Sequence, residues 1–182
     1  MHELLILRHG QTLWNAEGRM QGTLNSALDA TGHRQAARQR AILGGRDLTG
    51  FGAFCSPQGR AVETAGIAVA PLMPRITTDA RLREIGVGAW EGKRRADFVT
   101  AEAADLSYYD GAPGGEGFAA LRARCEAFLA ELTGPAVIVT HGITSRMLRL
   151  VALGMETAEL SALPGGQGNV HRIAGGDFEV LE

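Results

Sequence analysis

Short apolar runs alternate along this chain with longer segments of helical periodicity. Glu3–Leu7 and Ala136–Thr140 are almost wholly apolar, which is typical of strands covered on both faces of a sheet. The other expected strands are Phe51–Cys55, Arg75–Thr78 and a closing pair, Asn169–Ile173 and Phe178–Leu181, around a turn at Gly175 and Gly176.

Helices are expected between these strands. Each combines apolar positions with a start or stop signal; Ser56 and Pro57, for example, are placed to be the N-cap and the first residue of a helix. The expected helices are Thr31–Leu43, Ser56–Ala70, Lys93–Ala104, Phe118–Leu132 and Thr144–Leu153. Strands that alternate with helices predict an α/β fold with a mostly parallel central sheet, formed by a single domain over residues 1–182.

Polar residues follow directly after two of the buried strands. Arg8 and His9 follow the first apolar run, and His141 and Gly142 follow the second. In sheets of this kind, ligands bind beyond the carboxyl ends of the strands. We therefore expect His9 and His141 to meet at one end of the sheet.

Composition narrows the classes of function. Of the 182 residues, 45% are hydrophobic and 21% are charged, and the formal net charge is −2. The hydrophobic and charged fractions exclude an intrinsically disordered chain. Because the net charge is slightly negative, no overall positive charge favours a nucleic-acid partner. The chain has 17 arginines but a single lysine, Lys93, and it has 25 glycines. Genome composition or an anion site could produce both surpluses, and composition alone does not separate the two.

Nothing in the sequence indicates a membrane or an oxidising compartment. Cys55 and Cys125 have no metal-ligand spacing and form no disulfide framework. The longest apolar stretch, Ala65–Met73, is far shorter than the roughly 20 residues of a membrane-spanning helix, and the start of the chain does not resemble a signal peptide. We expect a cytoplasmic protein with no membrane partner.

A histidine placed among arginines indicates phosphoryl transfer. The planar guanidinium groups of Arg8 and Arg60 match phosphate oxygens, and glycines such as Gly142 let backbone N–H groups approach an anion. Because arginines repel a metal ion, we expect no metal, and His9 is instead a candidate nucleophile toward phosphorus. A carboxylate such as Glu84 could donate a proton to the leaving oxygen.

Four segments carry these groups in chain order. They are Leu7–Thr12 followed by Trp14 and Asn15, then Ser56–Ala65, then Leu82–Gly86 followed by Trp90–Gly92, and finally Val139–Gly142. Together these segments resemble the histidine phosphatase superfamily, the phosphoglycerate-mutase-like group, over essentially the whole chain. The resemblance implies a three-layer α/β/α sandwich and an enzyme that uses no cofactor.

The resemblance also implies roles for the matching residues. His9 would be the nucleophile that forms a phosphohistidine, and Glu84 would protonate the leaving alkoxide and then activate water. The residues implied to hold the phosphoryl group are Arg8, Arg60 and His141, with hydrogen bonds from Asn15 and the Gly142 backbone. The residues at positions where the family contacts substrate are Gln21, Gly22 and Thr23.

Parts of the pattern are open or depart from the family. Glu91 and Glu116 compete with Glu84 for the role of proton donor. Pro113–Glu116 resembles a loop of the phosphatase members, but Gly117 stands where those members usually carry a serine, so that hydroxyl contact is missing. The histidines that match no motif and are expected to be structural are His2, His33 and His171.

The spacing of the motifs favours a phosphatase over a mutase. Mutases of this family carry an insertion after the acid that is rich in basic and aromatic residues, including adjacent arginines. Here only about 30 residues separate Glu84 from Pro113, and Arg94 and Arg95 lie closer to Glu84 than the mutase pair would. We expect a metal-independent, histidine acid-type phosphatase, monomeric or homodimeric, acting on a sugar phosphate, a nucleotide-related phosphate or α-ribazole phosphate.

Other functions stay open at this stage: a phosphoglycerate mutase, a regulator that dephosphorylates phosphohistidine proteins, and an inactive binding module. The segments Trp90–Gly92 and Pro113–Glu116 argue against the regulator because they indicate a covered pocket. The inactive module is disfavoured because the candidate catalytic residues are all present, namely His9, Arg60, Glu84 and His141. A cysteine phosphatase is disfavoured, because only four residues separate Cys55 from Arg60 where that chemistry uses five.

Overall fold

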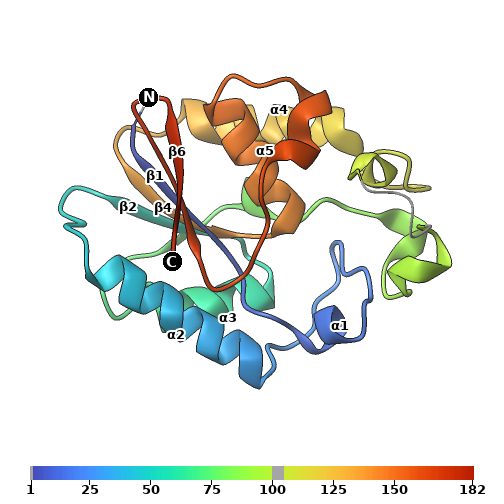
Figure 1. Ribbon diagram of the computed structural model, residues 1–182, viewed down its shortest axis with the longest axis horizontal. Helices are drawn as coiled ribbons and strands as arrows, with labels where there is room; N and C mark the ends of the chain where they lie inside the picture. The colour runs from blue at the N-terminus through green and yellow to red at the C-terminus, as the bar shows by residue number, and fades with distance from the viewer. Residues whose placement is uncertain (1, 100–104) are drawn as a thin grey trace.

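The computed structural model describes residues 2–99 and 105–182, and its centre is a six-stranded sheet (Figure 1). The strands are β1 (Leu4–Arg8), β2 (Gly52–Cys55), β3 (Thr77–Thr78), β4 (Ala136–Thr140), β5 (Val170–Ala174) and β6 (Asp177–Leu181), in the spatial order β3-β2-β4-β1-β5-β6. The first four strands in the chain run parallel to one another, and β5 and β6 join antiparallel beside β1. The expected mostly parallel sheet is confirmed.

Helices cover both faces of the sheet and produce three layers. α2 (Ala30–Gly44) and α3 (Gly59–Ala68) pack together on one face, and α4 (Gly117–Ala130) and α5 (Gly142–Ala152) pack together on the other. A short helix that was not expected, α1 (Leu13–Ala16), lies outside these layers. Among the helices of the described residues, none has the length and apolar character needed to cross a bilayer.

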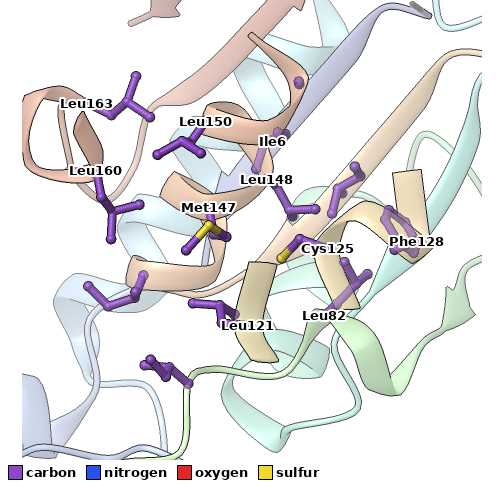
Figure 2. Close-up of a cluster of buried hydrophobic side chains, with 14 of the residues drawn as sticks. Ile6, Leu82, Leu121, Cys125, Phe128, Met147, Leu148, Leu150, Leu160 and Leu163 are labelled. Carbon is purple, nitrogen blue, oxygen red and sulfur yellow. The ribbon is translucent and has the colours of Figure 1, made fainter. Parts of the chain in front are cut away.

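The side chains of β1 alternate between two hydrophobic cores. Leu5 and Leu7 belong to the core under α2 and α3, and Leu4 and Ile6 belong to the core under α4 and α5. Figure 2 shows the second core, in which Ile6 lies among side chains of α4 and α5. Both faces of β1 are thus buried, which explains why its sequence is apolar without alternation.

The register of the sheet brings two histidines together. β1 and β4 are parallel neighbours in which Arg8 pairs with Thr140, and the His9 backbone N–H donates to the Thr140 carbonyl at 2.9 Å. His141 follows Thr140 directly, and the ring centroids of His9 and His141 are 5.1 Å apart. The prediction that these histidines meet at one end of the sheet is confirmed.

The prediction of a helix over Lys93–Ala104 is wrong for the described residues of this segment. That part contains only a 3-10 turn, Arg95–Asp97, and residues 100–104 lie outside the described chain. The backbone here bonds to an earlier segment instead: the Arg95 N–H donates to the Gly18 carbonyl at 2.9 Å. This long-range pairing overrides the local preference for helix.

The start of α3 also differs from the expectation. The helix begins at Gly59, Gln58 occupies the N-cap position without a side-chain cap, and Pro57 precedes the helix. The Ser56 hydroxyl, which was expected to cap the helix, lies 2.7 Å from His141 Nε2. The same hydroxyl accepts from the Gln58 N–H at 3.3 Å, so Ser56 bonds the N-cap residue and supports the histidine pair but is not itself the N-cap.

Candidate active site

A cavity of about 330 Å³ opens where β1 ends. The predicted site residues that line it are Arg8, His9, Asn15, Gln21, Gly22, Arg60 and Glu84. Thr23, His141 and Gly142 are not part of its lining. Residues from three of the four sequence motifs therefore converge on one cavity, and the fourth motif lies behind it through the contact between His141 and His9.

His9 has one defined tautomer. The His9 residue is 3% exposed, and its Nδ1 lies 2.7 Å from the Gly10 carbonyl oxygen. A carbonyl oxygen can only accept, so Nδ1 carries the proton and the lone pair is on Nε2. Burial, and then the charges of Arg60 and Arg8, lower the pKa of His9 well below its usual value. The ring is therefore neutral at neutral pH, and Nε2 carries the lone pair that a nucleophilic attack would use once its hydrogen bond from Arg60 is released.

The Arg60 guanidinium is buried beside that nitrogen. Nε donates to His9 Nε2 at 3.2 Å, and Nη2 and Nη1 donate to the carbonyls of Gly22 and Leu24 at 3.0 and 2.6 Å. Burial lowers the pKa of Arg60 to about 10, which still leaves it cationic at neutral pH. A positive charge thus lies where an anionic ligand would meet His9.

Arg8 brings a second guanidinium to the cavity. Its Nε is buried and has no hydrogen-bond partner among the described residues. Burial lowers the pKa of Arg8, and the carboxylate of Glu84 partly opposes this effect. A Cβ built on Gly142 would lie 3.4 Å from Arg8 Cζ, so the start of α5 packs close against this side chain. A buried donor without a partner is the arrangement that an anionic ligand would satisfy.

His141 is completely buried between His9 and Ser56. Its Nε2 pairs with the Ser56 hydroxyl, and its Nδ1 has no partner within the described part of the chain. Burial, followed by the charges of Arg60 and His9, lowers the pKa of His141 well below its usual value. The second histidine is therefore also neutral at neutral pH, and it reaches the site through its contact with His9.

Glu84 is held by the first turn of α5. Its Oε1 accepts from the backbone N–H groups of Ile85 at 3.0 Å and Thr144 at 3.1 Å. The Thr144 hydroxyl lies 3.1 Å from the same oxygen, but its one hydrogen faces the Arg83 carbonyl at 2.7 Å. Glu84 Oε2 accepts from the Ile143 N–H at 3.2 Å. The positive end of the helix dipole favours an acidic group at this position. This carboxylate is fixed in orientation and lines the cavity with His9.

The two competing carboxylates have other partners. Glu91 accepts from the Thr23 N–H at 2.8 Å and from the Thr23 hydroxyl at 2.7 Å. Gly22 has φ +51°, and a Cβ there would clash with Glu91, so this turn requires glycine. Glu116 pairs with Arg124 at 2.5 Å. Neither of these carboxylates lines the cavity, and Thr23, which Glu91 binds, does not line it either.

Asn15 and Gln21 are held by one threonine. The Thr12 N–H donates to Asn15 Oδ1 at 3.2 Å, the Asn15 N–H donates to Thr12 Oγ1 at 3.1 Å, and together these bonds form the capping box of α1. Gln21 Nε2 donates to the same hydroxyl at 2.9 Å. The short helix thus presents Asn15 to the cavity.

Several lining residues were not predicted. Met20, Ile85 and Val87 are lining residues with apolar side chains, and Tyr109, Arg19 and Arg95 are lining residues with polar groups. Tyr109 stacks on Tyr108 with ring centroids 4.5 Å apart, in a segment that has no clear periodicity. Gln58 was also missed, although its Oε1 accepts from the Glu84 N–H at 2.7 Å. Within residues 2–99 and 105–182, no three His, Cys, Asp or Glu side chains gather as a metal site would require.

Comparison with known proteins gives consistent matches over most of the chain. A family model described as the histidine phosphatase superfamily (branch 1) matches residues 4–179. A glucosyl-3-phosphoglycerate phosphatase of Mycobacterium tuberculosis is 32% identical over 98% of this chain and 90% of its own length. A probable phosphoglycerate mutase of Salmonella paratyphi C is 36% identical over 85% of this chain and 76% of its own length.

Two solved structures extend the similarity to three dimensions. A putative alpha-ribazole-5'-P phosphatase of Escherichia coli has a TM-score of 0.81 at 25% identity, and the match covers 98% of this chain and 94% of that one. A mycobacterial glucosyl-3-phosphoglycerate phosphatase in complex with VO3 has a TM-score of 0.80 at 29% identity, with coverage of 99% and 96%. Both likenesses extend over nearly the whole of each chain.

Proposed function

The chain belongs to the histidine phosphatase superfamily, and from that premise we propose that it is a phosphomonoester hydrolase that acts through a phosphohistidine on a small phosphorylated metabolite. The observation that carries this proposal is the state of His9. Its Nδ1–H donates to the Gly10 carbonyl, which fixes the proton on Nδ1, and its unprotonated Nε2 lies beside the Arg60 guanidinium in the wall of the cavity.

The reaction we propose has two displacements at phosphorus. In the first, His9 Nε2 forms the N–P bond while the ester P–O bond breaks, and Glu84 gives a proton to the departing alkoxide. In the second, water attacks the phosphohistidine, Glu84 takes a proton from that water, and the N–P bond breaks to release phosphate. The three backbone N–H groups that donate to the Glu84 oxygens support this role because they hold the carboxyl group at the cavity.

Charge in the site supports stabilisation of the transferring group. Arg8 and Arg60 place two cations at the cavity, where phosphoryl transfer depends on positioning and on electrostatic stabilisation more than on covalent chemistry. Asn15 would add a hydrogen bond. His141 and the Gly142 N–H, which lie behind the cavity lining, would also contribute to holding the phosphoryl group. In the proposal no metal or other cofactor takes part.

The substrate class follows from the relatives and from the size of the cavity. The relatives are named for glucosyl-3-phosphoglycerate, alpha-ribazole-5'-P and phosphoglycerate, and a cavity of about 330 Å³ suits a molecule of that scale. We propose a sugar phosphate, a nucleotide-related phosphate or α-ribazole phosphate. The short spacing from Glu84 to Pro113 favours hydrolysis over mutase activity. We further propose that the protein is cytoplasmic and that its single domain is monomeric or homodimeric.

A panel of phosphomonoesters tests this function. The panel contains sugar phosphates, nucleoside monophosphates, α-ribazole phosphate and phosphoglycerates, and released phosphate is measured with and without a chelator. We expect release that the chelator does not change, that His9→Ala abolishes, and that His33→Ala, at an exposed histidine of α2, retains. Interconversion of phosphoglycerates without release would establish a mutase. Loss of activity in the chelator that added metal restores would establish metal-assisted hydrolysis.

The role of Glu84 is tested by its dependence on the leaving group. Glu84→Gln should lower the rate about 10² to 10⁴-fold on alkyl phosphates, which need a protonated leaving oxygen, and much less on an activated aryl phosphate. Glu91→Gln is the matched control at a neighbouring carboxylate. If Glu91→Gln shows the dependence on the leaving group and Glu84→Gln does not, then the proton donor is Glu91.

A further inference from the structure

A loop between α5 and β5 reaches the nucleophile from a distant part of the sequence. Its first residues are tied to α5: Arg146 Nε donates to the Leu163 carbonyl at 3.0 Å, and Arg149 Nη2 donates to the Pro164 carbonyl at 2.9 Å. At the other end, Gln39 Nε2 donates to the Asn169 carbonyl at 3.0 Å. The segment from Leu163 to Asn169 is therefore anchored on both sides.

Gln167 lies in this loop between two glycines with left-handed backbones. Gly166 has φ +121° and Gly168 has φ +83°, conformations that other residues rarely adopt. This backbone path brings the Gln167 amide to the site, where Nε2 donates to the His9 carbonyl at 3.0 Å and to Asn15 Oδ1 at 3.4 Å. One amide group thus connects the backbone of the nucleophile to a side chain of the cavity wall.

Two backbone groups determine how the amides of Gln167 and Asn15 are turned. The His9 carbonyl can only accept, so the nitrogen of Gln167 must face it. The Thr12 N–H can only donate, so the oxygen of Asn15 must face it, and that oxygen also receives the second N–H of Gln167. With Oδ1 occupied by two donors, Asn15 can offer only its Nδ2 group to the cavity that it lines.

We propose that Gln167 is a positioning residue that turns the Asn15 amide so that it donates to the phosphoryl group. This inference rests on the proposed function, because it takes the ligand of the cavity to be a phosphate. Without the Gln167 bond, the Asn15 oxygen is held by the Thr12 N–H alone, so the orientation that presents Nδ2 to the cavity is less strongly favoured over the flipped one, whose oxygen repels an anion. Gln167 thereby selects for a negatively charged ligand without touching it.

A double-mutant cycle between Gln167 and Asn15 tests this role, with the dissociation constant of inorganic phosphate measured by calorimetry. Gln167→Met keeps the length of the side chain and removes its donors, so phosphate should bind about fivefold more weakly, the typical effect of one hydrogen bond. In the Asn15→Ala background the same change should have almost no further effect, because the group that it orients is absent. Gln167→Ala, measured in parallel, should give the same pattern.

Two controls separate this inference from the function on which it rests. Arg60→Met should weaken phosphate binding far more than Gln167→Met. Arg172→Met, at a residue of β5, removes an ion pair with Glu3 and should leave phosphate binding unchanged. If wild type and Arg60→Met bind phosphate equally, the anion site and the proposed function are both wrong. If Arg60→Met and Asn15→Ala weaken binding but Gln167→Met does not, or if the effects of Gln167 and Asn15 simply add, only the inference about Gln167 is overturned.

Discussion

The chain buries two arginines beside histidines, and only one of these pairs lines the cavity. Arg60 and Arg149 are each 1% exposed, and neither forms an ion pair within the described residues. Arg60 Nε lies 3.2 Å from His9 Nε2, and Arg149 Nη1 lies 3.4 Å from His171 Nδ1. Burial lowers the pKa of Arg60 to about 10 and that of Arg149 to about 9.

The difference between the two pairs lies in what surrounds them. Arg149 donates to the carbonyls of Ser145 and Pro164 and lies 5.4 Å from the centre of the Phe178 ring, so protein groups surround it. Arg60 lines the cavity together with His9. A buried arginine and a histidine with a lowered pKa therefore do not identify a site by themselves. Access of the reactive nitrogen to a cavity is the distinguishing feature.

The largest expected contrast is between the same substitution at the two arginines. Arg60→Met removes a cation from the transferring phosphoryl group and should lower kcat/KM by about 10² to 10³-fold. Arg149→Met removes a buried charge outside the cavity and should leave kcat/KM within about threefold. Because Arg149→Met also leaves the Ser145 and Pro164 carbonyls without this donor, it should lower the free energy of unfolding by about 1 to 3 kcal/mol.

Steady-state kinetics and urea denaturation of both variants measure this contrast. Equal losses of kcat/KM in the two proteins would remove the distinction between a catalytic pair and a structural pair. Arg149 donates to the Pro164 carbonyl in the loop that carries Gln167, and the loss of this bond is why we expect up to a threefold decrease of kcat/KM in Arg149→Met.

A smaller effect is expected at His171, the histidine of the second pair, and it concerns how the free energy of unfolding depends on pH. Burial, with the charges of Arg149 and Arg146, lowers the pKa of His171 to about 3 in the folded protein, against an ordinary 6.5. Between these values the unfolded chain binds the proton and the folded chain does not, so His171 makes the free energy of unfolding fall as the pH is lowered from 6.5 toward 3. Above pH 6.5 this loss is absent.

His171→Gln removes the titrating group and should flatten this dependence. Between pH 7 and pH 5 wild type should lose roughly 1 to 2 kcal/mol more of its free energy of unfolding than the variant. Urea denaturation at the two pH values measures the difference, and His9 and His141, which titrate in both proteins, cancel in it. Parallel pH profiles would show that His171 is not held neutral by its surroundings.

Local sequence was sufficient for much of the fold and for the centre of the site. The apolar run of β1 predicted a strand buried on both faces, and the polar residues at its end predicted where His9 would lie. The pairing of β1 with β4, which the structure shows and the sequence did not predict, is what places His141 directly beside His9. The predicted features depend on periodicity and on the general topology of α/β sheets, which a sequence displays directly.

Features that depend on distant partners could not be predicted in this way. Ser56 has the signature of a helix cap, but its hydroxyl contacts His141, and the segment near Arg95 bonds to Gly18 instead of forming a helix. Tyr109 lines the cavity and Gln167 contacts His9 and Asn15, both from segments without periodicity. In each case the deciding contact joins residues far apart in the chain, and one sequence alone does not reveal such pairs.

The most direct test of the central claim is to trap the phosphoenzyme. Substrate labelled at phosphorus is mixed with enzyme and quenched within milliseconds, and the label bound to protein is tested for stability in acid and base. We predict an adduct that is labile in acid and stable in base, absent from His9→Ala and retained in His171→Ala, the histidine of the second pair. An adduct of the same stability that persists in His9→Ala would contradict the assignment of His9 as the nucleophile.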